Sequence, residues 1–221
     1  MSTTSETIPW REAAREAAYE GAQAELRARR DTYPGLGAYR YEHVRAVVGV
    51  AVRLAELTGA DVETVEAAAW LHDVSKSYSK QHGLDSAIAA RKVLAGTDFP
   101  PSKVDAVVDA IEKHVGLTTT EPVEPLEAAI LWDADKLTKL GATIVIHMSA
   151  LLLASHREKR ITTEHLIGEW GNPAWGAVPL PYFHTKPAQE AGRARYEALL
   201  AFAEQARREW TAEDLDATQF S

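Results

Sequence analysis

Helix-forming residues dominate this chain, and that preference limits the folds it can adopt. Ala, Leu, Glu and Arg are abundant, and apolar residues rarely alternate with polar ones at the period of two that strands require. Pro, Gly and Asp stand where helices begin or end. We therefore expect an all-α bundle of about eight or nine helices. Those that we can delimit span 10–30, 41–58, 61–72, 84–95, 102–114, 125–141, 142–155 and 187–210.

A chain of 221 residues can bury a substantial core without disulfides or metal staples. We expect one domain over residues 1–221, since a domain of this kind commonly takes up such a length. Its motif-bearing core spans about 39–142, and a helical extension spans about 143–221. Within the extension, residues 171–183 are rich in Pro, Gly and aromatic residues, so we expect an irregular loop there.

Charge and cysteine content exclude several classes of function. Lys and Arg number 24 against 32 Asp and Glu, which gives a formal net charge of −8. Such a surface repels nucleic-acid polymers and anionic membranes, so we expect neither as a partner. The absence of cysteine excludes thiolate metal sites and a cysteine nucleophile. We see no membrane span and no signal peptide, and we expect a cytoplasmic protein.

Polar residues stand at the ends of apolar seams on four of the expected helices. On a helix, positions three, four and seven residues apart lie on one face. His43 begins such a seam, and seams on three other helices end at His72, His114 and Asp135. Buried imidazoles and carboxylates need partners, and two carboxylates brought together need a cation between them. A divalent metal satisfies both, because neutral imidazole and ionised carboxylate are its natural ligands.

The ordered set is more informative than its parts. Taken singly, each histidine could equally be a satisfied core or surface residue, and the His72-Asp73 doublet in AAAWLHDVSK is a common two-letter match. The succession of His43, this doublet and Asp135, each on its own seam, favours a metal site. Asp133 is the alternative to Asp135, and its other interpretation is a surface carboxylate near Lys136.

These residues resemble the HD superfamily of metal-dependent phosphohydrolases, whose pattern is H…HD…D on an all-helical core. The resemblance covers about residues 39–142. It implies His43, His72, Asp73 and Asp135 as metal ligands, and the Ala-Asp pair in LWDADKLTKLGA favours Asp135 over Asp133.

Part of the chain is also similar to the HD subgroup that hydrolyses symmetrical diadenosine polyphosphates. The similar segments are YRYEHVRAVVGVAVRLAE, AAWLHDVSK and QHGLDSAIAARKVL. This similarity implies two further ligands, His82 and His114, for a second metal ion. From His114 onward the sequence departs from the subgroup, so the resemblance implies the metal chemistry without specifying the substrate.

The resemblance implies a hydrolase that cleaves a phosphoester or phosphoanhydride of a nucleotide-like substrate with metal-activated water. The cofactor would be one or two divalent ions of Mn, Ni, Co, Fe, Mg or Zn. Asp73 would bridge the metals or orient the water, and Lys76 would act in catalysis on the substrate phosphate. Arg40 would clamp phosphate through its planar guanidinium. The alternative for Lys76 is a solvated lysine at a helix end, and the alternative for Arg40 is a surface arginine.

Two other functions stay open, together with the oligomeric state. One is a metal- or nucleotide-binding HD module without turnover. The other is a di-iron HD-type oxygenase, because ligand types alone do not separate iron from manganese or nickel. His147 lies in a very apolar helix, where we expect it to pack in the core or between helices. Residues 144–154 fit either a core helix or a homodimer interface.

Overall fold

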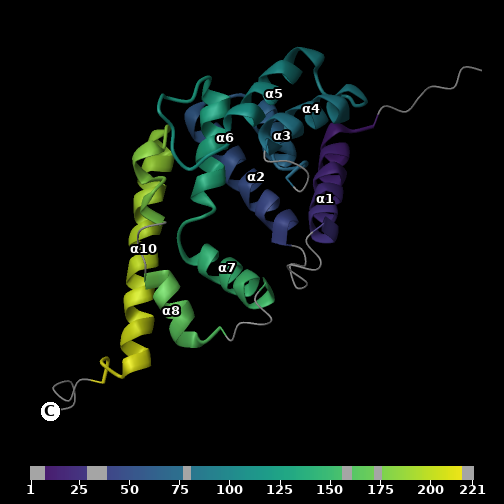
Figure 1. The fold of residues 1–221 in the computed structure, drawn as a ribbon. Helices are drawn as coiled ribbons and strands as arrows, with labels where there is room; N and C mark the ends of the chain where they lie inside the picture. The colour runs from purple at the N-terminus through teal and green to yellow at the C-terminus, as the bar shows by residue number, and fades with distance from the viewer. Residues whose placement is uncertain (1–7, 29–38, 77–80, 156–160, 172–175, 216–221) are drawn as a thin grey trace, which may run out of the picture.

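The computed structural model describes residues 8–28, 39–76, 81–155, 161–171 and 176–215. The regular secondary structure of these residues is helical, and they form no strand. One isolated β-bridge joins Ile8 to Thr97. The expected all-α class is confirmed. The helices drawn in Figure 1 are α1 (Trp10–Ala28), α2 (Tyr39–Thr58), α3 (Val62–Leu71), α4 (His82–Ala95), α5 (Val104–Lys113), α6 (Leu126–Leu137), α7 (Ala142–Ser155), α8 (Thr163–Gly171) and α10 (Lys186–Thr211).

Two helices with few polar residues form the centre of the core. On α3, every residue from Ala67 to Leu71 is buried, and on α6 every residue from Ala128 to Leu137 is buried. A helix that is apolar on all sides must be covered on all sides. Helix α3 packs against α1, α2, α5 and α6, and α4 lies against α5. The polar residues of α6 therefore need partners inside the protein.

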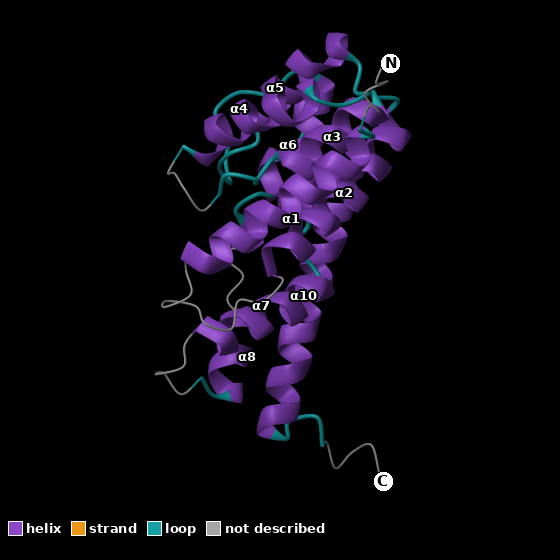
Figure 2. Ribbon diagram, turned by 90° about the vertical axis from the view of Figure 1, so that its right-hand side faces the viewer, coloured by secondary structure: helices purple, strands orange, loops and turns teal. Residues whose placement is uncertain are grey.

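The C-terminal helices extend away from this core. Figures 1 and 2 show α7, α8 and one end of α10 beyond the cluster of α1 to α6. The other end of α10 returns to contact α6 and α2. Val145, Leu199 and Ala203 form a small second core between α7 and α10. Ile144 is also buried, as in a core helix, whereas Ile146 is 75% exposed. The homodimer interface expected for residues 144–154 as the alternative stays a prediction.

Several boundaries differ from those expected, and one helix was not expected at all. Helix α4 begins at His82, and the expected helix 102–114 divides into a short 3₁₀ turn, η1 (Pro101–Lys103), and α5. Helix α6 ends at Leu137, before the turn in which Gly141 has a φ of +87°. Helix α8 lies where we delimited none. The expected irregular loop contains a second 3₁₀ turn, η2 (Leu180–Tyr182), and residues 172–175 lie outside the described residues.

None of the helices in the described part of the chain is long and apolar enough to cross a bilayer.

The start of α3 follows the expected chemistry. Asp61 accepts a hydrogen bond from the Thr64 amide at 2.7 Å, which caps the helix as the sequence predicts.

We predict opposite effects for two glycine-to-alanine substitutions in helices. A Cβ added at Gly21 of α1 would lie 2.5 Å from the Val74 carbonyl oxygen, directly after Asp73. Gly21→Ala should therefore lower the free energy of unfolding by about 1–3 kcal/mol through overpacking. Gly49→Ala on α2 is the control, because a Cβ there meets nothing within 4 Å. It should gain up to ~1 kcal/mol from helix propensity. Urea unfolding measures both, and equal stabilisation by both changes would contradict this account.

Candidate metal centre

Five helices bring the predicted ligands to one place in the core. The turn at the end of α3 and the end of α5 supply residues directly, and α2, α4 and α6 supply the others. The residues are His43 on α2, His72 at the C-cap of α3 with Asp73 after it, His82 at the start of α4, His114 at the C-cap of α5, and Asp135 on α6.

The two C-cap histidines are oriented by the same local hydrogen bond. Nδ1 of His72 donates to the Ala69 carbonyl at 2.7 Å, and Nδ1 of His114 donates to the Ile111 carbonyl at 2.5 Å. A carbonyl only accepts, so Nδ1 carries the proton and Nε2 keeps its lone pair for another partner. Nε2 of His72 is buried without a hydrogen-bond partner among the described residues. A metal ligand needs this tautomer and orientation.

Asp73 belongs to two groups of closely spaced donor atoms. His43, His72 and Asp73 form the first group, and Asp73, His82 and His114 form the second. Within each group the donor atoms lie within 4.8 Å of one another. Asp73 Oδ2 lies 3.6 Å from His72 Nε2, whereas Oδ1 lies 3.7 Å from Nε2 of both His82 and His114. The two oxygens of one carboxylate thus face different groups.

Asp135 lies beside the first group, and Asp133 does not. Oδ1 of Asp135 is 3.1 Å from His43 Nε2, although Asp135 is not part of either close group. Asp133 accepts hydrogen bonds from the backbone amides of His184 and Thr185, at 2.9 and 2.8 Å, and from the Thr185 hydroxyl. It fastens the segment that leads into α10. The surface interpretation of Asp133 is wrong, because its side chain is fully buried.

Burial keeps two of the imidazoles neutral. It lowers the pKa of His72 to about 3, with the neighbouring His114 and His43 rings adding to the effect. Burial, followed by the nearby Lys76 ammonium, lowers the pKa of His82 to about 4. Neutral imidazole is the form that binds metal, so these ligands need not lose a proton at neutral pH.

Both carboxylates are ionised despite their burial. Burial raises the pKa of Asp73, but the rings of His72 and His114 and the Arg40 guanidinium outweigh it and hold the pKa well below its ordinary value. Burial likewise raises the pKa of Asp135, and the ammonium groups of its two lysine neighbours hold it well below that value. Ionised carboxylates and neutral imidazoles together fit a divalent cation.

Three lysines lie beside these carboxylates. Asp135 Oδ2 accepts hydrogen bonds from Lys136 at 2.9 Å and from Lys139 at 2.8 Å. Lys76 Nζ lies 3.4 Å from Asp73 Oδ1 and 2.7 Å from Nε2 of His82. Lys76 therefore contacts the second group of donor atoms. A lysine that acts on the substrate phosphate, as the resemblance implies, would need to lie at the site in this way.

Arg40 connects the site to a carboxylate that our sequence analysis missed. Its NH1 donates to Asp73 Oδ2 at 2.8 Å, and its Nε donates to Glu25 Oε2 at 2.6 Å. The surface interpretation of Arg40 is wrong, since both partners are buried. Glu25 on α1 is 2% exposed and lies three residues after the buried Ala22. The same apolar spacing that marked the histidine seams was present here.

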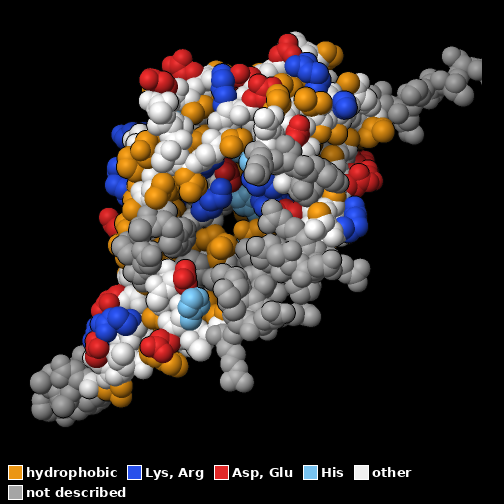
Figure 3. All heavy atoms as spheres, viewed as in Figure 1, with side chains coloured by type: hydrophobic (Ala, Val, Ile, Leu, Met, Phe, Trp, Pro, Cys, Tyr) orange, Lys and Arg blue, Asp and Glu red, His pale blue; other side chains and the backbone are white. Residues whose placement is uncertain are grey.

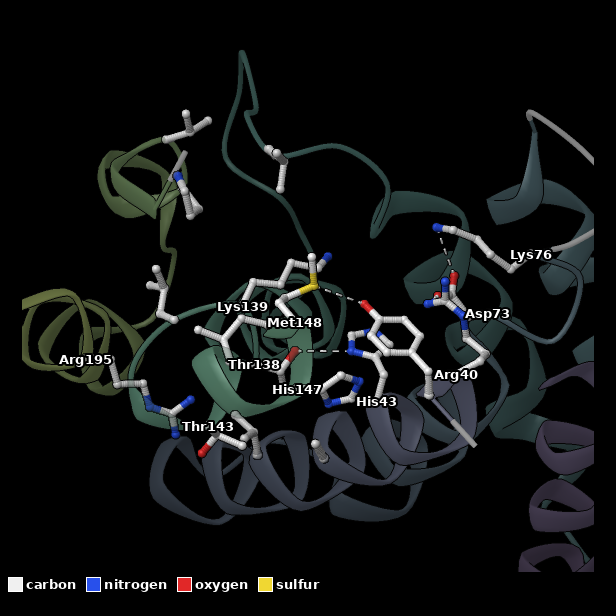
Figure 4. A pocket seen from close by; sticks show the side chains of 18 of the residues that line it. Arg40, His43, Asp73, Lys76, Thr138, Lys139, Thr143, His147, Met148 and Arg195 are labelled. Carbon is white, nitrogen blue, oxygen red and sulfur yellow. Dashed lines mark hydrogen bonds and ion pairs between the residues drawn. The ribbon is translucent and has the colours of Figure 1, made fainter. Parts of the chain in front are cut away.

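Two of the donor residues, His43 and Asp73, line a cavity of about 650 Å³. Figure 3 shows this region as a hollow where histidine and cationic side chains gather, and Figure 4 shows its lining. Arg40, His43, Asp73 and Lys76 line the cavity, and so does His147. The expectation that His147 packs between helices holds in part. Its ring packs edge-on against Tyr39 at a centroid distance of 4.3 Å, while the side chain also lines the cavity.

The family model of the HD domain matches residues 40–140. Residues 40–140 of this chain therefore match the HD domain. The match begins at Arg40 and ends just after Lys139, so it includes the donor groups and leaves out α1, α7, α8 and α10. The HD-superfamily resemblance predicted from the motif is confirmed.

The fold resembles those of several solved structures. An HD-superfamily hydrolase of Bacillus thuringiensis is 20% identical, with a TM-score of 0.61 over 89% of this chain and 99% of that one. A predicted HD-superfamily hydrolase of an uncultured Thermotogales bacterium is 22% identical, with a TM-score of 0.57 over 85% and 92%. YpgQ of Bacillus subtilis in complex with ADP is 18% identical, with a TM-score of 0.57 over 86% and 96%. The shared fold therefore extends beyond the HD domain.

One curated relative is a tRNA methyltransferase. A segment of 82 residues is 34% identical to the tRNA (cytidine(56)-2'-O)-methyltransferase of Thermoplasma volcanium. The match covers 37% of this chain and 22% of the methyltransferase. The chain thus corresponds to about a fifth of that longer protein.

We predict that acidification destabilises the metal-free HD domain through His72. Its pKa is about 3 in the folded state against an ordinary value of 6.5. Between these values the unfolded chain binds a proton that the folded chain does not, so stability falls as the pH drops below 6.5. At pH 5 the loss from this residue is about 2 kcal/mol.

Urea unfolding at pH 7 and pH 5, after removal of metal by a chelator, measures this effect. His72→Gln is the comparison, because glutamine does not titrate in this range. The wild-type protein should lose about 2 kcal/mol more than the variant on acidification. An identical loss in both proteins would show that His72 already binds its proton in the folded state.

Proposed function

We propose that this protein is a metal-dependent phosphohydrolase, which cleaves a phosphoester or phosphoanhydride of a nucleotide-like substrate with water. The main support is the arrangement around Asp73, whose two oxygens face two groups of donor atoms at the end of a cavity. Cations line the same end of the cavity. Hydrolysis of a phosphate group needs an in-line water and neutralisation of the phosphoryl oxygens, and such a site can provide both.

We propose that each group of donor atoms holds one divalent cation. His43, His72 and Asp73 would hold the first, with Asp135 beside them, and Asp73, His82 and His114 would hold the second. The unpartnered, buried Nε2 of His72 supports this assignment. Four imidazoles favour a transition metal such as Mn, Fe, Co, Ni or Zn over Mg, which prefers oxygen ligands. When bound, such cations polarise phosphoryl oxygens and lower the pKa of water towards ~7.

The protein's own residues would bind and position the substrate. The Lys76 side chain is 29% exposed, and its Nζ lies 3.4 Å from Asp73 Oδ1. It could therefore contact a phosphoryl oxygen while it stays beside Asp73. Lys139 lines the cavity from the other side. Arg40 is held by Glu25 and in turn holds Asp73, so its first task is to orient that carboxylate. Its remaining donors are available to phosphate.

The size and lining of the cavity support a nucleotide-sized substrate. Small-molecule sites commonly enclose about 300–1,000 Å³, and this cavity encloses about 650 Å³. Its walls are apolar beyond the donor groups, at Val50, Ile144 and Met148 among others. The complex of YpgQ with ADP gives a nucleotide precedent on the same fold.

We also propose that the HD core and the C-terminal helices act as one domain. Asp133 on α6 binds the segment before α10, and Arg195 on α10 donates to the Leu137 carbonyl at 2.6 Å. Ile144 of α7 and Arg195 line the same cavity as Asp73. The substrate would thus contact both parts of the chain.

We predict metal-dependent hydrolysis that requires Asp73. Chelator-treated protein is supplied with Mn, Co, Ni, Fe, Zn or Mg and a panel of nucleotides and diadenosine polyphosphates, and the nucleotide and phosphate products are separated by chromatography. Asp73→Asn should lower the rate of product formation by more than about 100-fold, because it removes the carboxylate shared by both groups. Asp105→Asn is the matched control, since that carboxylate is 87% exposed and pairs with Arg91. It should leave the rate unchanged.

The outcome separates the proposed function from its alternatives. If no metal produces hydrolysis products above the level of Asp73→Asn, the protein is a binding module and the hydrolase proposal fails. If iron instead supports oxygen uptake that Asp73→Asn abolishes, the protein is an oxygenase.

We predict up to two metal ions per chain. Elemental analysis after gel filtration should find about half as much metal in His82→Gln as in the wild-type protein, because that change removes a ligand of the second group alone. His165→Gln is the control for adventitious binding, since His165 is exposed and lies outside both groups. Equal metal content in the two variants would contradict the second site.

A further inference from the structure

The cavity has a second end, which the proposed chemistry does not use. Figure 4 shows Asp73 and Lys76 at one end, and Arg195 of α10 with Thr143 of α7 at the other. All four residues line the same cavity. A ligand that reaches both ends must carry one group for the metal centre and another for Arg195.

Arg195 is a half-buried cation that no carboxylate of the described residues balances. It donates one hydrogen bond, from NH1 to the Leu137 carbonyl at 2.6 Å, and it forms no ion pair with any of the described residues. Burial lowers its pKa, and no neighbouring charge raises it. Glu169 also lines the cavity, but its carboxylate lies 3.8 Å from His165. A guanidinium has five N–H donors, so most of those on Arg195 are unspent.

The backbone holds Arg195 in place. Gly141 connects α6 and α7 with a φ of +87°, and a Cβ added there would lie 3.2 Å from Cβ and Cγ of Arg195. This close approach confines the stem of the side chain, while the Leu137 carbonyl binds one nitrogen of its head. A confined guanidinium loses little further entropy when it binds a ligand.

We propose that Arg195, together with the Thr143 hydroxyl, forms a distal subsite for a second anionic group on the substrate. The substrate class is an organic phosphate whose body carries a further phosphate or carboxylate, away from the phosphoryl group at the metal centre. The placement of one phosphoryl group at the metal centre, with the second anion at Arg195, rests on the proposed function. Apolar residues between the two ends would cover the body of the ligand.

Electrostatics favour an anion over a neutral group at this end. A partly buried cation without a counter-ion is costly, and an anionic ligand relieves that cost. Hydrogen bonds between charged partners are also about twice as strong as those between neutral ones. Thr143 and Arg195 both lie outside the HD domain match at residues 40–140. The C-terminal helices would therefore select the substrate on which the HD core acts.

Two matched ligand pairs test the subsite and separate its two anion sources. Orotidine 5′-monophosphate differs from uridine 5′-monophosphate by one carboxylate on the base. Adenosine 3′,5′-bisphosphate differs from adenosine 5′-monophosphate by one phosphate. Calorimetry with Mn-loaded wild-type protein should find at least one doubly anionic ligand bound about tenfold tighter than its partner. The pair that shows the preference identifies the anion.

Variants assign the preference to Arg195. Arg195→Met should abolish it, and Arg195→Lys should retain part of it because the charge remains. Arg193→Met is the matched control, since Arg193 is exposed on the same helix and does not line the cavity. It should keep the full preference. If Arg195→Met does not fold, as judged by thermal unfolding, Thr143→Val tests the subsite and should reduce the preference several-fold.

The proposal fails if the wild-type protein shows no preference in either pair, or if Arg195→Met weakens both members of a pair equally. Phosphate release is measured in parallel. If the protein prefers the ligand with the second anionic group but hydrolyses none, the hydrolase function is contradicted and the subsite is supported. If it hydrolyses a ligand but shows no such preference, only the subsite is contradicted.

Discussion

The ionised carboxylate of Asp73 determines how the rest of the core is arranged. A buried carboxylate without partners is costly, so charges of opposite sign must surround it. Arg40 provides one of them, and its own side chain is only 14% exposed, so Glu25 on α1 supplies it with a second carboxylate. Gly21, one helical turn earlier, allows α1 to approach the backbone beside Asp73. The N-terminal helix is thus part of the charge balance of the metal centre.

Helix α6 completes that balance from the opposite side. Its buried Lys136 donates to the His114 carbonyl and to Asp135, and so connects the end of α5 to the carboxylate that lies beside the first group of donor atoms. The end of α5 has unsatisfied carbonyls like any helix end, and a buried ammonium is an effective partner for them. This position of Lys136 is stable because Asp135 is ionised beside it. Asp133, two residues earlier, uses its carboxylate to hold the segment before α10 instead.

Periodicity predicted the part of the site that depends on single helices. The seams that end at His72, His114 and Asp135 follow from helix geometry alone, and the structure brings all three residues to one core. His82 came only from a family resemblance, because it starts its helix and has no seam before it. Glu25 ended a seam that we did not examine for polar residues. The surface interpretation of Asp133 failed because its partners, His184 and Thr185, lie about fifty residues away in the chain.

The charge distribution reconciles an acidic protein with an anionic ligand. The net charge of −8 acts over the whole surface, but salt screens it beyond a Debye length of about 8 Å. The described charged residues that line the cavity are four cations, Arg40, Lys76, Lys139 and Arg195, and two carboxylates, Asp73 and Glu169. A small phosphorylated molecule enclosed there experiences mainly these cations. A nucleic-acid polymer would leave most of its phosphates on the acidic exterior, where repulsion opposes binding. On the proposed function, the same distribution would favour a compact anion over an extended one.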